Sequence, residues 1–248
     1  MRAIVRSLLM FFTTVSCFVV WTVGRPFAHL ARRAQAWRSY IFRVWSRSLC
    51  ALVGMSHSVR GVPPPAPCVL VSNHLSYLDI VLIASHVGVV FVSKAEVAHW
   101  PLLGFLSRSV GTIFVQRGAR RRLPEVNASI HAALARGERV VVFPEGTSSG
   151  GSDVGPFKPA LLEPAAGGRY PVYCAALGYR TAPGAPPASE AVCWWGDMPF
   201  GSHVLGLLRM SHFHASLEFD SQAYRGQDRK ELAQATWQAV AEMHGRLS

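Results

Sequence analysis

The hydrophobic pattern of the chain changes character near residue 60. Before it, the run SLLMFFTTVSCFVVWTVG (7–24) carries no charge over 18 residues. A helix needs ~20 residues to cross a hydrocarbon layer, so this pattern predicts a membrane helix. A cleaved signal peptide is the alternative, because Arg2 and Arg6 precede the run, but no small-x-small cleavage site follows Gly24. The pattern leaves open whether the run spans the bilayer or enters one leaflet.

The segment 27–52 mixes arginines with Trp, Tyr, Phe and Leu. This composition is typical of a helix that lies in an anionic headgroup layer, and a solvated basic face packed on the protein is the alternative. More arginines follow the apolar run than precede it. The positive-inside bias therefore predicts the inner (cytoplasmic) membrane as the location, with the catalytic domain on its cytoplasmic side.

After the proline-rich stretch GVPPPAPC (61–68), short β-branched runs alternate with helix-like segments. The expected strands cover 68–72, 89–93, 111–115, 139–143, 171–177 and 215–219. The expected helices cover 77–86, 123–137 with Gly137 as its C-cap, and 228–247 with Asp228 as its N-cap. We predict a single α/β domain with a mixed, mostly parallel sheet flanked by helices, over 61–248, and membrane-associated helices over 1–60.

The net charge of +11 is concentrated in the N-terminal third. Nine arginines precede Asp79, and no lysine or acidic residue does. Because this excess lies beside an apolar run and no recognition motif accompanies it, we expect membrane lipids as partners and no nucleic acid. A basic nucleic-acid-binding protein is the alternative.

The five cysteines show no C-x-x-C spacing, and Cys17 lies inside the apolar run. They indicate reduced structural thiols, and we expect no metal site, no disulfide framework and no cofactor.

Candidate chemistry begins where the run VLVS ends. Asn73 and His74 would lie at the carboxyl edge of the sheet, where α/β folds bind ligands, and Asp79 would fall in the first turn of the next helix. A carboxylate there can fix the imidazole tautomer and support the charge that develops on His74 as a general base. The alternative is that His74 and Asp79 are ordinary polar residues of a turn and a helix start, without a catalytic role. The motif G-x-S-x-G is absent from the sequence, so we expect the activated hydroxyl to belong to a substrate.

Two later stretches offer anion-binding groups. VSKAEVAHWPLLGFLSRSVGTIFVQRG (92–118) carries Lys94 and Arg117 in a glycine and proline frame, and Arg117 is the stronger candidate for holding a headgroup bidentately. RVVVFPEGTSSGG (139–151) ends an apolar strand at Glu145, which needs hydrogen bonds if it is buried. Backbone amides at Gly146 and Thr147 can approach an anion closely. A structural turn is the alternative.

Together these stretches resemble the glycerolipid (1-acylglycerol-3-phosphate and lysophospholipid) acyltransferase family. The resemblance rests on four blocks in the same order, namely NHLSYLD, KAEVAHWPLLGFLSRSVGTIFVQR, VVFPEGTSS and YPVYCAALGY. It implies transfer of a fatty acyl group from acyl-ACP or acyl-CoA, as co-substrate, to a lysolipid hydroxyl. It also implies that His74 is the base and Asp79 its orienting partner, that Glu145 and Gly146 help form the acceptor site, and that Arg117 binds the phosphate.

One departure concerns the acceptor. The phosphatidate-forming branch usually has Arg where this chain has Ser148, although Lys158 could supply a point charge in its place. We expect 1-acylglycerol-3-phosphate as the acceptor, giving phosphatidic acid, with lyso-ornithine lipid or a lysophospholipid as a close alternative. A catalytically silent lipid-binding relative is a third possibility, and the intact His74 and Asp79 speak against it.

Overall fold

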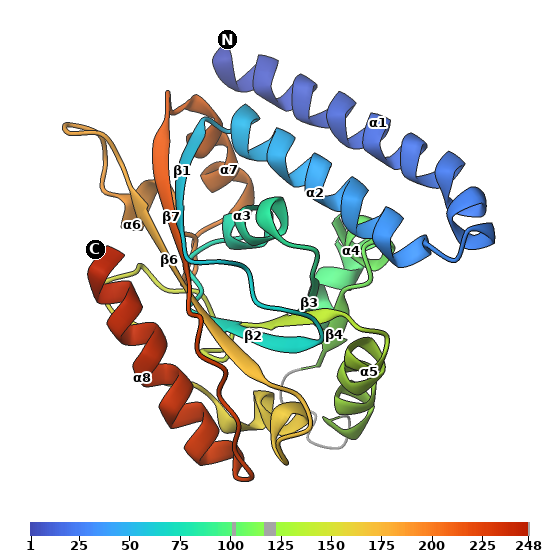
Figure 1. The fold of residues 1–248 in the computed structure, drawn as a ribbon. Coiled ribbons are helices and arrows are strands. Elements are labelled where there is room, and N and C mark those ends of the chain that lie inside the picture. Colours follow the sequence, from blue (N-terminus) through green and yellow to red (C-terminus); the bar gives the residue numbers. More distant parts are fainter. Residues whose placement is uncertain (101–102, 117–122, 248) are drawn as a thin grey trace.

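The computed structural model describes residues 1–100, 103–116 and 123–247. Its centre is a seven-stranded sheet with the order β1-β7-β6-β2-β5-β3-β4 (Figure 1). The strands are β1 (Met55–Arg60), β2 (Cys68–Ser72), β3 (Val90–Lys94), β4 (Ile113–Val115), β5 (Arg139–Val142), β6 (Val172–Arg180) and β7 (Phe213–Phe219). Only β6 and β7 pair antiparallel, so the predicted mixed, mostly parallel sheet is confirmed.

Helices cover both faces of the sheet, as expected for an α/β domain (Figure 1). The α-helices are α1 (Arg2–Leu30), α2 (Ala34–Leu52), α3 (Leu78–His86), α4 (Leu103–Ser109), α5 (Leu123–Ala135), α6 (Ala188–Ala191), α7 (Phe200–Arg209) and α8 (Arg229–Leu247). Short 3-10 turns are η1 (Ala95–His99), η3 (Pro159–Leu161) and η4 (Glu163–Ala165). The predicted caps form: Gly137 ends α5 with φ +80, and the Asp228 carboxylate accepts the N–H groups of Lys230 and Glu231 at the start of α8.

The two faces of the sheet bury separate cores. Along β2, Leu70 packs with α2 and α3, whereas Val69 and Val71 pack with α5 and α8. All three side chains are at most 2 % exposed. A strand buried on both faces reads as a continuous apolar run, which is why CVLVS stands out in the sequence.

Strand β1 was not among the predicted strands. Its sequence MSHSVR lacks an apolar alternation, and most of its residues are exposed. It is nonetheless part of the sheet, because it pairs in parallel with β7 from Met55 to Arg60. The proposed division of the chain at residue 60 stays a prediction.

The N-terminal segment forms a helical hairpin. Helix α1 runs past the predicted apolar stretch to Leu30, the chain turns at Arg32 with φ +56, and α2 follows alongside (Figure 1). Two indole N–H groups of α2 tie the helices together, Trp37 to the carbonyl of Trp21 and Trp45 to the hydroxyl of Thr14. By length and composition α1 could cross a membrane.

Candidate active site

Two parallel strands end side by side and carry the candidate residues. Val71 of β2 and Val142 of β5 are partners in the ladder, so the residues that follow them meet at the same edge of the sheet. Glu145 lies there beside the turn after β2, and its Oε1 accepts the backbone N–H of His74 at 2.7 Å. Strand pairing thus joins two motifs that are 71 residues apart.

His74 and Asp79 form a hydrogen-bonded pair. Nδ1 of His74 lies 2.7 Å from Oδ2 of Asp79, which is fully buried. The same oxygen accepts the N–H groups of Leu75 at 2.7 Å and Ser76 at 3.0 Å. These bonds compensate the burial of a carboxylate. In this pair Nδ1–H of His74 donates to Asp79, which leaves Nε2 of His74 for another partner.

Tyr179 completes the environment of Asp79, and the sequence did not identify it. Its hydroxyl donates to Oδ1 of Asp79 at 2.7 Å. Burial, followed by the charge of Asp79, raises the pKa of Tyr179 well above its usual value, so the phenol remains a donor at physiological pH. The only hint in the sequence was its position near the end of an apolar strand.

The ring of His74 is held flat against Phe143. The two rings stack with centroids 4.1 Å apart and an interplanar angle of 15°. Phe143 directly follows β5, so the strand that delivers Glu145 also supplies this contact. Stacking and the bond to Asp79 together fix the orientation of the imidazole.

Glu145 is engaged with backbone at both oxygens. Oε1 accepts His74 N–H, and Oε2 accepts Gly155 N–H at 2.8 Å. Burial raises the pKa of Glu145, and these two hydrogen bonds act in the opposite direction. The carboxylate therefore connects the candidate catalytic turn (residues 73–79) to the glycine-rich loop (residues 146–156).

Asn73 is likewise engaged with backbone. Its side chain is 1 % exposed, donates to the carbonyl of Leu177 at 2.9 Å and accepts the N–H of Leu177 at 2.8 Å. It therefore fastens the catalytic turn to β6. The substrate-binding roles of Asn73 and Glu145 stay predictions, and the contacts described here are with the protein itself.

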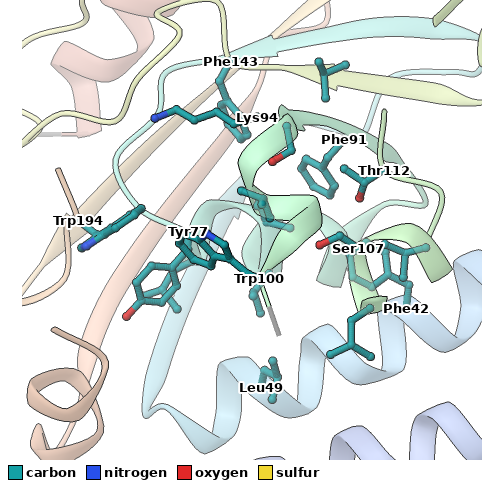
Figure 2. A pocket seen from close by; sticks show the side chains of 18 of the residues that line it. Phe42, Leu49, Tyr77, Phe91, Lys94, Trp100, Ser107, Thr112, Phe143 and Trp194 are labelled. Atoms are coloured by element: carbon teal, nitrogen blue, oxygen red, sulfur yellow. The ribbon is translucent and has the colours of Figure 1, made fainter. Parts of the chain in front are cut away.

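A cavity of about 1210 Å³ opens beside His74. Helices α1 and α2 contribute apolar side chains to its lining, and the glycine loop contributes Gly146, Thr147 and Ser148. Figure 2 shows Lys94 and Phe143 toward one end of the cavity and Leu49 of α2 toward the other. An elongated apolar space that reaches a histidine suits an amphiphilic substrate.

Two of the three predicted cationic residues line this cavity. Lys94 and Lys158 both line it. The Lys158 side chain crosses over Gly146, where an added Cβ would lie 2.7 Å from Nζ. Ser148 lines the cavity as well, but its hydroxyl donates to the carbonyl of Trp194 at 2.6 Å. Arg117 lies outside the described residues.

Comparisons with known proteins match the part of the chain that carries these residues. The family model named Acyltransferase matches residues 56–178. The chain is 35% identical over 205 residues to the lyso-ornithine lipid O-acyltransferase of Pseudomonas aeruginosa, covering 82% of this chain and 78% of that protein. It is 33% identical over 219 residues to the enzyme of the same name from Rhizobium meliloti, with 83% and 75% covered.

Two further comparisons concern 1-acyl-sn-glycerol-3-phosphate acyltransferases. The protein of that name from Neisseria gonorrhoeae is 35% identical over 115 residues, which is 46% of this chain and 45% of that protein. The crystal structure of the 1-acyl-sn-glycerophosphate (LPA) acyltransferase PlsC from Thermotoga maritima covers both chains fully, with a TM-score of 0.61 and 19% identity. That likeness concerns the fold.

Proposed function

This chain belongs to the acyltransferase family, and from that premise we propose that it transfers a fatty acyl group from a coenzyme A or acyl-carrier-protein thioester to the free hydroxyl of a lysolipid. The observation that carries this proposal is the hydrogen bond from Nδ1 of His74 to buried Asp79 beside an elongated apolar cavity. The histidine has an orienting partner on one nitrogen and a substrate-sized space next to it.

The chemical step needs no protein nucleophile. Nε2 of His74 takes the proton of the acceptor hydroxyl as the oxygen attacks the thioester carbonyl, and Asp79 stabilises the imidazolium that forms. Collapse of the tetrahedral intermediate breaks the carbon–sulfur bond, and the leaving thiolate takes the proton back from His74. General-base assistance of this kind contributes about 100- to 10,000-fold to the rate.

For the acceptor, we place lyso-ornithine lipid ahead of 1-acylglycerol-3-phosphate. Four relatives named lyso-ornithine lipid O-acyltransferase are 30–35% identical over more than 80% of this chain. The Neisseria glycerophosphate enzyme aligns with 46% of it, and a Brassica napus protein named 1-acyl-sn-glycerol-3-phosphate acyltransferase aligns with 80% at 28% identity. In addition, Ser148 carries no positive charge that could bind a phosphate, and its hydroxyl donates a hydrogen bond to the carbonyl of Trp194. A zwitterionic headgroup with a single carboxylate requires fewer cations than a phosphate monoester.

1-Acylglycerol-3-phosphate remains the second candidate for a specific reason. Two lysines, Lys94 and Lys158, line the cavity, and point charges bind phosphate even without a bidentate arginine. Arg117, outside the described residues, would be the third cation of such a site. Either acceptor is a membrane lipid, and we propose that α1 and α2 hold the domain at the cytoplasmic leaflet.

A direct assay separates these possibilities. Purified full-length protein in mixed micelles would receive palmitoyl-CoA or palmitoyl-ACP together with lyso-ornithine lipid, lysophosphatidate or lysophosphatidylethanolamine, and products would be identified by mass spectrometry. We expect ornithine lipid as the main product and its loss in His74→Ala. Phosphatidate as the main product would reverse the order of the acceptors, and full activity of His74→Ala would refute the mechanism.

A further inference from the structure

His244 is a buried histidine far from the catalytic turn in sequence. It lies in the last turns of α8, is 5 % exposed, and shares the inward stripe of that helix with Val240 and Leu247. A polar ring on an apolar stripe requires partners inside the protein. Its neighbours include Asn73 and backbone groups of β6 and the glycine-rich loop.

Two carbonyl groups flank the ring of His244. Nδ1 lies 3.0 Å from the carbonyl oxygen of Leu177 on β6, and Nε2 lies 3.0 Å from the carbonyl oxygen of Gly151. Leu177 is the residue that exchanges both of its backbone bonds with Asn73, and Asn73 Nδ2 lies 3.4 Å from Nδ1 of His244. Carbonyl oxygens only accept, and a neutral imidazole donates from one nitrogen. With Nε2–H donating to Gly151, Nδ1 is the acceptor for Asn73 Nδ2, so the ring bridges Asn73 and the glycine-rich loop.

The loop that His244 reaches also touches the catalytic turn. Ser149 N–H donates to the carbonyl of His74 at 2.9 Å, and Gly155 N–H donates to Glu145. Gly151 sits between these bonds with φ +83, and a Cβ there would lie 3.2 Å from Leu75 Cδ2. The loop therefore packs directly on the turn, and its first residues line the cavity.

We propose that His244 is a positioning residue for the acyl transfer, which holds the glycine loop 146–156 against the catalytic turn by hydrogen bonding to the carbonyl of Gly151. This inference rests on the proposed function. Glycine-rich backbone has many accessible conformations, so the loop needs fixed points close to the residues that line the cavity. Glu145 holds it at Gly155, and His244 holds it at Gly151.

The rate of acyl transfer depends on the exact position of the reacting groups. Displacement of a reactive group by about 1 Å can cost about 100-fold in rate. Loss of the Gly151 contact releases the loop whose Ser149 N–H fixes the carbonyl of His74. We therefore expect the rate constant to fall while substrate binding changes little, because most of the residues that line the cavity lie outside this loop.

Two substitutions distinguish the contacts of the ring. Asn places its amide oxygen near the position of Nδ1 and would keep an acceptor for Asn73 Nδ2. Gln places its nitrogen near the position of Nε2 and would keep the contact with Gly151. A residue that acts through the glycine loop should therefore be rescued by Gln better than by Asn.

The matched control lies on the same helix. Thr236 is fully buried, and its hydroxyl donates to the carbonyls of Leu232 and Ala233 within α8. Thr236→Val removes a buried polar group from α8 without touching the loop. It reports what general destabilisation of this helix does to activity.

The experiment uses the full chain in mixed micelles, with kcat and KM for palmitoyl-CoA and the acceptor, and melting by circular dichroism. Assays are run well below the melting temperature of each variant. We expect kcat of His244→Ala to be about 10- to 100-fold lower than that of the wild type, with both KM values changed less than about threefold. His244→Gln should recover more of kcat than His244→Asn, and Thr236→Val should keep kcat. A kcat that follows only the folded fraction, or equal recovery by Asn and Gln, would overturn the proposal.

Hydrogen exchange gives a second readout that does not depend on turnover. Amides of the peptide covering 146–156 should exchange faster in His244→Ala and His244→Asn than in Thr236→Val. Unchanged exchange there would refute the tie between His244 and the loop. If the wild-type protein acylates no lysolipid although the exchange changes as expected, the proposed function fails and the tie stands.

Discussion

Oδ2 of Asp79 lies 2.7 Å from Nδ1 of His74 and also accepts the N–H groups of Leu75 and Ser76. One carboxylate oxygen therefore shapes the turn and orients the imidazole of His74 within it. Because all four residues are consecutive or nearly so, the arrangement forms locally once β2 and α3 are in place. Charge and shape at Asp79 can be separated by substitution.

Asp79→Asn tests the charge. An amide oxygen can still accept the backbone N–H groups, so we expect the fold to persist, but a neutral side chain does not stabilise the imidazolium of His74. We expect kcat to fall about 100- to 10,000-fold in the lysolipid assay, with a nearly unchanged circular dichroism spectrum. Asp197→Asn, at an exposed position, is the control. Activity within about threefold of wild type would contradict the assigned role.

Tyr179→Phe tests the hydrogen bond from the Tyr179 hydroxyl to Asp79. Removal of the phenol leaves Oδ1 of buried Asp79 without its donor. A buried carboxylate oxygen without a partner should lower the free energy of unfolding by about 1–3 kcal/mol, measured by urea denaturation with the wild type in parallel. An unchanged free energy of unfolding would mean that Tyr179 only fills space.

The proximity of His74 and Asp79 was predictable from the sequence, and their surroundings were not. His74 and Asp79 lie in one short motif, so spacing alone places them together. Phe143 and Tyr179 come from strands paired on opposite sides of β2, and their contacts depend on strand order and register. Glu145 was predicted at the acceptor site, but the bonds of its two oxygens to backbone N–H groups became visible only in three dimensions.

In the fold, too, some elements were predictable from the sequence and others were not. The predicted strands and helices all form, with ends shifted by a few residues, because each has a strong apolar pattern. Strand β1 was missed because its exposed MSHSVR sequence carries little hydrophobic pattern, and its pairing with β7 decides its conformation. Helix α7 was missed because Gly201 and Gly206 weaken its helix propensity. Its place is set by packing, including the Arg6 bonds to the carbonyls of Met210 and Ser211.

The cysteines should be unreactive in the native protein. Burial raises the pKa of Cys50 to about 11 and those of Cys68 and Cys193 to about 12, and it raises that of Cys174 further. Since the thiolate is the nucleophile, almost none is present at these sites at pH 8. A thiol titration with Ellman's reagent at pH 8 should count at most one group, Cys17, before unfolding and five afterwards. Two or more fast groups in the native protein would contradict the described burial.

Lys158 should act on the acceptor headgroup. Its ammonium lies over Gly146 at the cavity, and a charge-assisted hydrogen bond to a carboxylate or phosphate contributes about 1.5–3 kcal/mol. Lys158→Gln should therefore raise KM for the acceptor about 10-fold or more and leave KM for palmitoyl-CoA nearly unchanged. Lys158→Arg keeps the charge and should recover part of the loss. Lys230→Gln, on the exposed start of α8, is the control, and an equal rise of both KM values would argue against a headgroup contact.

Ser148→Arg should change which lysolipid is preferred. The hydroxyl of Ser148 donates to the carbonyl of Trp194 at the edge of the cavity, and a guanidinium at this position would offer bidentate hydrogen bonds to a phosphate monoester. We expect the ratio of kcat/KM for lysophosphatidate to that for lyso-ornithine lipid to rise about 10-fold. Ser148→Ala removes only the bond to Trp194, at a cost of about 1 kcal/mol in stability, and serves as the matched control. The ratio is measured with both acceptors competing in one micelle. If Ser148→Arg and Ser148→Ala give the same ratio, the residue at this position does not select the acceptor.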